Sequence, residues 1–171
     1  MAVKETMAFI GDSGAISTEL MRKLAQHGYR LLFISKDVGR MEKLSQELDL
    51  QESHAEVEML ECAKDGCWEA DIIAFVDPAH IGTELVKKVR EVSTQKILLG
   101  IETTEHPGSC FSTAELDRLQ KDFPFSKLVY IKVDTSAVKV QVHGEQQEAV
   151  ETVSRIFESV GFEIKPITIN Q

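Results

Sequence analysis

Short apolar runs alternate along this chain with stretches in which apolar residues recur every three or four positions. Such runs predict buried strands, and spacings such as Ile16–Leu20–Leu24 predict amphipathic helices. Strands separated by helices indicate a parallel sheet that is covered on both faces. The predicted strands of this first part are Thr6–Ile10, Arg30–Ser35, Ala55–Leu60, Asp71–Val76 and Lys96–Ile101.

The second half of the chain predicts a different arrangement at one edge of the sheet. Ser112 and Glu115 form a capping-box pattern that begins a helix, and Lys127–Val133 and Ala137–Gly144 are strand-like. The link between these two strands is too short for a crossover helix, so we expect them to run antiparallel. A helix that ends at Gly161 and a final edge strand containing Pro166 complete the chain.

The fold class that follows is α/β: a doubly wound Rossmann sheet, mostly parallel, with the order 3-2-1-4-5-6 and the last two strands added antiparallel at one edge. With 171 residues, we expect residues 1–171 to form a single domain.

Charge and cysteine content narrow the range of binding partners and cellular locations that we expect. The net charge of −9 argues against nucleic acid, and no apolar run approaches the roughly 20 residues that cross a membrane. Three cysteines, Cys62, Cys67 and Cys110, suggest a reducing, cytoplasmic location and buried or half-buried thiols, with no metal site. A homodimer is an expectation that the sequence leaves open.

The stretch "IGDSGAIS" (10–17) carries the first candidate site. Gly11 ends the first strand and Gly14 opens the following helix, so the backbone N–H groups of Ser13, Gly14, Ala15 and Ile16 can face a pyrophosphate. Two alternatives stay open. One is a plain turn without ligand, and the other is a nucleophilic Ser13 with its histidine and acid downstream.

The end of the second strand predicts which dinucleotide would bind. Ser35 follows Gly14 by 21 residues, the position of the adenosine ribose in a doubly wound fold. Ser35, Lys36 and Arg40 offer a hydroxyl and two cations, which suit the 2′-phosphate of NADP. Asp37 is the rival acid for NAD, and a solvated start of a helix is the alternative without ligand.

The fourth strand ends in Val76, Asp77 and Pro78, where the strand order reverses and ligands usually bind. His80 is the histidine of this segment and has a proton-transfer role or an ordinary place in the first turn of a helix.

These segments resemble a known family. "IGDSGAIS", "ISKDVGRMEKL", "ADIIAFVDPAHI" and the tail from "KLVYIKVDT" are similar to the deazaflavin (factor-420)-dependent NADP oxidoreductases. They are also similar to the cytoplasmic reductase domain of membrane metalloreductases. The resemblance implies a dinucleotide, NADP, held by Gly11 to Ile16 and by Ser35, Lys36 and Arg40, with its nicotinamide near Val76 and Pro78.

Three features depart from that family: Ser17 replaces the third glycine, "IETTEHP" replaces an Asn-Pro after the fifth strand, and "IKVDTSAV" lacks an asparagine. Two functions follow. One is an NADP(H)-dependent oxidoreductase that transfers hydride to an unidentified acceptor of flavin or deazaflavin type, with no catalytic residue assigned. The other is a non-catalytic Rossmann-like module that binds a nucleotide or a partner protein.

Overall fold

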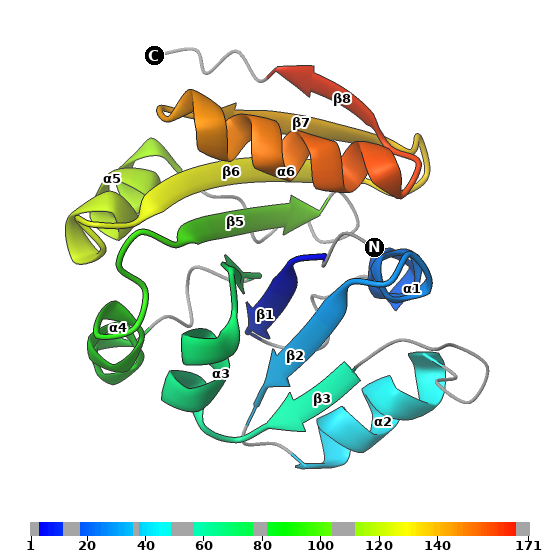
Figure 1. Ribbon diagram of the computed structural model, residues 1–171, viewed down its shortest axis with the longest axis horizontal. Coiled ribbons are helices and arrows are strands. Elements are labelled where there is room, and N and C mark those ends of the chain that lie inside the picture. Colours follow the sequence, from blue (N-terminus) through cyan, green and yellow to red (C-terminus); the bar gives the residue numbers. More distant parts are fainter. Residues whose placement is uncertain are drawn as a thin grey trace.

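A single sheet runs through the computed structural model, which describes residues 4–11, 18–35, 38–48, 57–76, 82–103 and 112–166. Its strands are β1 (Thr6–Ile10), β2 (Arg30–Ile34), β3 (Val57–Leu60), β4 (Ile72–Phe75), β5 (Ile97–Thr103), β6 (Lys127–Asp134), β7 (Lys139–Gly144) and β8 (Glu163–Pro166). They lie in the order β3-β2-β1-β4-β5-β6-β7-β8, and Figure 1 shows them from β3 at the bottom to β8 at the top.

The strand directions confirm the predicted fold class. All neighbours from β3 to β6 are parallel, β7 runs antiparallel to β6, and β8 runs parallel to β7. The last two strands are therefore antiparallel to the rest of the sheet. The β6–β7 link is a turn over residues 135–138, too short for the helix that a parallel connection needs.

Helices cover both faces of the sheet and create two cores. In the described residues they are α1 (Thr18–Gln26), α2 (Val38–Leu48), α3 (Ala63–Glu69), α4 (Thr83–Arg90), α5 (Thr113–Asp122) and α6 (Gln147–Ser159). One core joins alternate strand residues such as Phe9 and Phe33 to α1, α2 and α6. The other joins residues such as Ile73 and Phe75 to α3, α4 and α5. Continuous apolar strands follow from this two-sided burial.

The helix ends predicted at Ser112 and Gly161 are confirmed. The backbone N–H of Glu115 donates to the Ser112 hydroxyl at 3.2 Å, and the Glu115 carboxylate accepts from the Ser112 N–H at 2.8 Å. Gly28 ends α1 at φ +87° and Gly161 ends α6 at φ +98°. In both, the next residue donates its N–H back into the last turn, a hydrogen bond that a left-handed glycine makes possible.

The segment between β3 and β4 differs from the sequence prediction. It contains α3, a short helix that the apolar spacing did not indicate, because only Ala63, Gly66 and Cys67 face the core. A Cβ at Gly66 would lie 2.8 Å from Ile34 Cδ1, so glycine lets α3 approach β2 closely. The prediction of buried thiols is confirmed for Cys67 and wrong for Cys62, which precedes the helix and is exposed; Cys110 lies outside the described residues.

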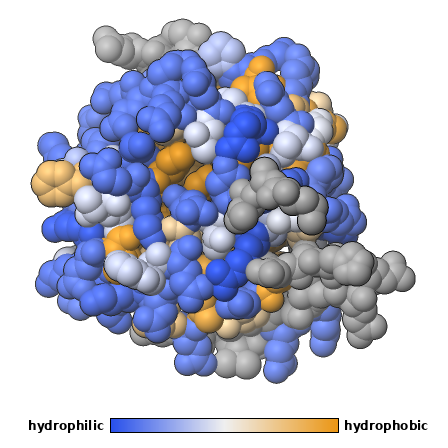
Figure 2. Space-filling model, in the orientation of Figure 1, coloured by the Kyte–Doolittle hydropathy of each residue, from blue (hydrophilic) through white to orange (hydrophobic). Residues whose placement is uncertain are grey.

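No helix among the described residues is both long and apolar enough to span a bilayer. Hydrophilic residues predominate on the face shown in Figure 2, and hydrophobic residues form small, separate patches there.

Candidate functional site

Three of the residues singled out in the sequence come together at the carboxyl ends of the central strands. Ile10 pairs with Ile34 of β2 and with Phe75 of β4, so the residues that follow, Gly11, Ser35 and Val76, end adjacent strands. The Val76 N–H donates to the Ile10 carbonyl at 3.1 Å. The chain leaves β1 toward β2 on one side and reaches β4 on the other. This reversal of strand order opens the crevice in which doubly wound folds bind ligands.

Gly11 has the backbone conformation that the phosphate hypothesis requires. Its backbone angle φ is +147°, a value that residues other than glycine rarely adopt. Gly11 is half-buried at the end of β1. A turn that lacks a side chain there allows a ligand to approach the backbone. The other predicted phosphate-binding residues, Ser13, Gly14, Ala15 and Ile16, lie outside the described residues.

The residues predicted to select the cofactor are described in part. Ser35 is half-buried directly after β2, and its N–H donates to the Leu60 carbonyl at 3.1 Å. Arg40 lies in the first turn of α2. Lys36, Asp37 and the Arg40 side chain lie outside the described part, so the choice between NADP and NAD remains a prediction.

The nicotinamide end of the predicted site is represented by Val76. This residue is 3% exposed and packs in the same core as Ile101 of β5. Pro78 and His80 lie outside the described residues, and their roles remain predictions.

The structure adds one group that the sequence analysis missed. Glu102, next to last in β5, is 5% exposed, and its carboxylate accepts a hydrogen bond from the Tyr130 hydroxyl. Lys132 pairs with Glu102 in register, and its Nζ lies 3.7 Å from Glu102 Oε1. The available signal was an acidic residue at the end of an otherwise apolar strand.

No other described cluster suggests a cofactor. Within the described ranges, no group of three or more His, Cys, Asp or Glu side chains could hold a metal ion. Burial raises the pKa of the Cys67 thiol to about 12, and the ammonium of Lys96 opposes that rise. A thiol that stays protonated near neutral pH is a poor nucleophile or metal ligand, so Cys67 acts as a core residue.

Solved structures similar to this chain include several reductases. An imine reductase from Pseudomonas sp. has a TM-score of 0.70 at 15% identity, with 95% of this chain and 55% of that chain covered. A protein from Arthrobacter sp. that is assigned as a factor-420-dependent NADP reductase has a TM-score of 0.66 at 16% identity. The match covers 94% of this chain and 82% of that chain. Pyrroline carboxylate reductase from Plasmodium falciparum, solved with NADP bound, has a TM-score of 0.65 at 14% identity. The match covers 97% of this chain and 58% of that chain.

No protein-family model and no curated protein sequence matches the chain. At these identities the likeness establishes the fold, which is the doubly wound, Rossmann-type α/β fold. The chain spans just over half the length of the imine reductase.

Proposed function

We propose that residues 1–171 form a domain that binds a nicotinamide dinucleotide at the carboxyl ends of β1, β2 and β4, and that it serves an NADP(H)-dependent oxidoreductase. The observation that carries this proposal is the adjacency of Gly11, Ser35 and Val76 at the point where the strand order reverses. Residues that are 65 positions apart in the chain, Gly11 and Val76, thus border one crevice.

The residues present fit the parts of such a cofactor. Gly11, at positive φ, leaves room for a pyrophosphate, which the backbone N–H groups of Ser13, Gly14, Ala15 and Ile16 would bind. Ser35, Lys36 and Arg40 would bind the adenosine 2′-phosphate. Val76 and Pro78 would contact the nicotinamide. The bound cofactor would supply hydride chemistry, and this chain would bind and orient it.

The similar structures support the same class of function. The Arthrobacter protein is assigned as an NADP reductase, and the Plasmodium enzyme was solved with NADP bound. The flavin or deazaflavin type of acceptor, the likeness to membrane metalloreductases, the cytoplasmic location and the homodimer remain predictions from the sequence.

Calorimetric titration with NADPH and with NADH tests the proposal. We expect roughly ten- to hundredfold tighter binding of NADPH, about 1.4–2.8 kcal/mol, because Lys36 and Arg40 would pair with the extra phosphate. The double variant Lys36→Ala, Arg40→Ala should lose this preference and keep the weaker NADH affinity. Lys87→Ala with Lys88→Ala removes two exposed positive charges from α4 and should leave the preference unchanged.

Two results would contradict parts of the proposal. Equal affinity of the unmodified chain for NADPH and NADH would refute the NADP assignment and leave a dinucleotide-binding domain. Binding of neither nucleotide would refute the dinucleotide site and favour the non-catalytic module.

A further inference from the structure

Two large aromatic side chains are exposed at the amino ends of the strands, at the opposite end of the sheet from the proposed dinucleotide crevice. In the described part of the chain, Trp68 of α3 is 70% exposed and Phe125, in the turn before β6, is 69% exposed. A single exposed apolar residue is ordinary. Two aromatic residues on one surface are more informative, because aromatic side chains are enriched in the cores of protein interfaces.

Trp68 and Phe125 lie on either side of the turn that leads into β5. The Gln95 N–H donates to the Phe125 carbonyl at 2.8 Å, and the Lys96 ammonium donates to the Trp68 carbonyl at 2.6 Å. Gln95 has a φ of +68°, a left-handed conformation that residues other than glycine seldom adopt. This turn therefore joins both aromatic residues to the start of one strand.

A hollow of about 210 Å³ lies beside Trp68 and is open to solvent. It is lined by Trp68, Glu91, Val92, Thr94 and Lys96. Its two charged side chains already have partners: Glu91 pairs with Lys64 at 2.6 Å, and the Lys96 ammonium is bonded to the carbonyls of Cys67 and Trp68. Because neither charge requires a ligand, the hollow suits an apolar side chain.

Charges of opposite sign surround the two aromatic residues. The charged residues are Lys64, Asp65, Glu69 and Asp71 around Trp68, and Arg118, Lys121, Asp122 and Lys127 around Phe125. Acidic residues predominate in the first group and basic residues in the second. The last turn of α4, which leads into the turn before β5, is also basic.

This distribution of charge fits a second copy of the same chain. A chain with a net charge of −9 repels its own copy over most of its surface. Here each copy presents a basic region that can face the acidic region of the other. A surface with one acidic and one basic half is complementary to itself after a twofold rotation.

We propose that two copies of the chain associate about a twofold axis through the aromatic surface, which consists of Trp68, Phe125 and residues 91–96. Phe125 of each copy enters the hollow beside Trp68 of the other, and the basic end of α5 faces the acidic α3. The proposal goes beyond the proposed function. Because the aromatic surface lies at the amino ends of the strands, this dimer leaves both dinucleotide crevices open.

Sedimentation equilibrium over a range of protein concentrations tests the proposal, since it measures the dissociation constant of the dimer. We expect the unmodified chain to form dimers. Trp68→Ser and Phe125→Ser should each raise the dissociation constant about a hundredfold, because each change removes two symmetry-related contacts. Both side chains are exposed, so we expect both variants to keep the circular dichroism spectrum of the folded chain.

A pair of charge variants tests the electrostatic part of the proposal. Lys121→Glu places an acid on the basic side of the aromatic surface and should raise the dissociation constant about tenfold. Lys165→Glu makes the same change of charge on the edge strand β8, away from this surface, and is the matched control. It should leave the dissociation constant unchanged.

A monomer at every concentration up to the solubility limit would overturn the proposal. So would a dimer whose dissociation constant is the same in Trp68→Ser and Phe125→Ser as in the unmodified chain. Weakening by Lys165→Glu alone would place the contact at the exposed edge of β8 and also overturn it. If one aromatic variant does not fold, the other variant and Lys121→Glu decide.

Discussion

The two ends of the sheet are built differently. At the amino ends of the strands, described side chains and backbone groups bond across elements that are distant in sequence. Asp71, just before β4, exchanges two hydrogen bonds with Thr6 at the start of β1, both of 2.8 Å. At the carboxyl ends, β1 finishes in a glycine at positive φ, with the ends of β2 and β4 beside it.

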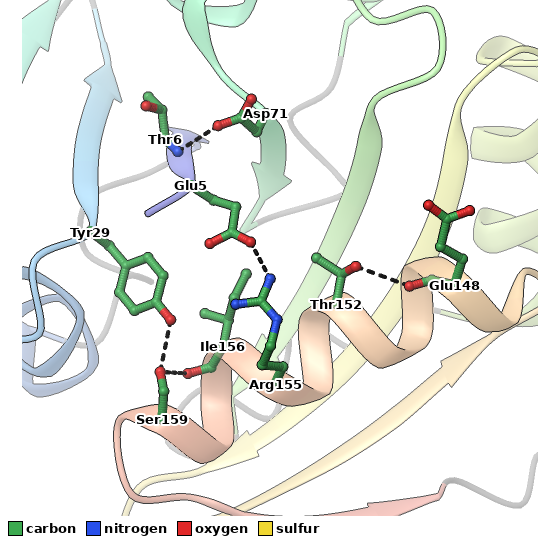
Figure 3. Close-up of polar contacts among 9 residues, drawn as sticks. All are labelled: Glu5, Thr6, Tyr29, Asp71, Glu148, Thr152, Arg155, Ile156 and Ser159. Atoms are coloured by element: carbon green, nitrogen blue, oxygen red, sulfur yellow. Dashed lines mark hydrogen bonds and ion pairs between the residues drawn. The ribbon is translucent and has the colours of Figure 1, made fainter. Parts of the chain in front are cut away.

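The amino end is further fixed by contacts of α6 and of the α1–β2 turn. The Tyr29 hydroxyl is hydrogen-bonded to Ser159 Oγ at 2.7 Å, and Arg155 of α6 forms an ion pair with Glu5. Figure 3 shows both contacts. Before β5 and β6, the buried Ser126 hydroxyl donates to the Ser93 carbonyl at 2.8 Å. These separate contacts hold the starts of the strands to one another and to α6.

The difference predicts that stability and ligand binding depend on opposite ends. A change at the amino end should lower the free energy of unfolding and leave nucleotide affinity unchanged. A change in the loops that follow β1, β2 and β4 at the carboxyl end should do the reverse. This division follows from a scaffold that holds its binding residues in loops on one side.

The largest expected effect is that of Gly14→Val at the carboxyl end. We expect dinucleotide binding to be lost, because a branched side chain in the predicted phosphate loop would block approach to the backbone N–H groups. The midpoint of urea unfolding should remain close to that of the unmodified chain. Titration and urea unfolding are the two measurements, and unchanged nucleotide affinity would mean that this glycine serves a plain turn.

A smaller effect, on stability, is expected at the amino end from a double-mutant cycle on Tyr29 and Ser159. Tyr29 is 1% exposed and its hydroxyl bonds to Ser159 Oγ, which itself donates to the Ile156 carbonyl at 2.6 Å. Tyr29→Phe and Ser159→Ala should each cost about 1 kcal/mol in unfolding free energy, with a coupling of about 0.5–1.5 kcal/mol. A loss of NADPH affinity in either variant would break the proposed division between the two ends.

The same contrast explains what the sequence could predict. Apolar runs and turn residues depend on neighbours in the chain, so strand order, the antiparallel edge and the Ser112–Glu115 cap are confirmed. The helix α3 was missed because its buried face consists of small residues. The pairing of Glu102 with Lys132 was missed because it depends on the β5–β6 register, which periodicity does not contain.

For the candidate site, sequence spacing predicted which residues end the central strands, and the structure places Gly11, Ser35 and Val76 together. The predicted choice of NADP over NAD rests on the side chains of Lys36 and Arg40, which lie outside the described part. The sequence of one strand does not show whether a carboxylate in it is buried or exposed. That depends on the helix that covers its face of the sheet and on the strand paired with it.

The smallest expected effect concerns Asp134, which closes the turn after β6 at the carboxyl end. Its Oδ1 accepts from the Ala137 N–H at 3.0 Å and from the Ser136 hydroxyl at 2.7 Å. These hydrogen bonds hold the pKa of the Asp134 carboxyl below its ordinary value, and the bond from the Ala137 N–H contributes most. Because the pKa is lower in the folded chain, the charge of Asp134 stabilises the fold above the unfolded-state pKa, near 4.

That stabilisation is lost as the pH falls through the folded-state pKa, because the proton then binds both states. Asp134→Asn keeps an oxygen acceptor and cannot titrate, so it should be slightly less stable than the unmodified chain at pH 7. The difference in unfolding free energy between the two proteins should narrow as the pH is lowered from about 5 to 3. Urea unfolding of both proteins across this range measures it, with NADPH affinity at pH 7 as the control. A stability difference that stays constant with pH would show that the turn depends on hydrogen bonding alone. A change in NADPH affinity would show that this turn contributes to the nucleotide site.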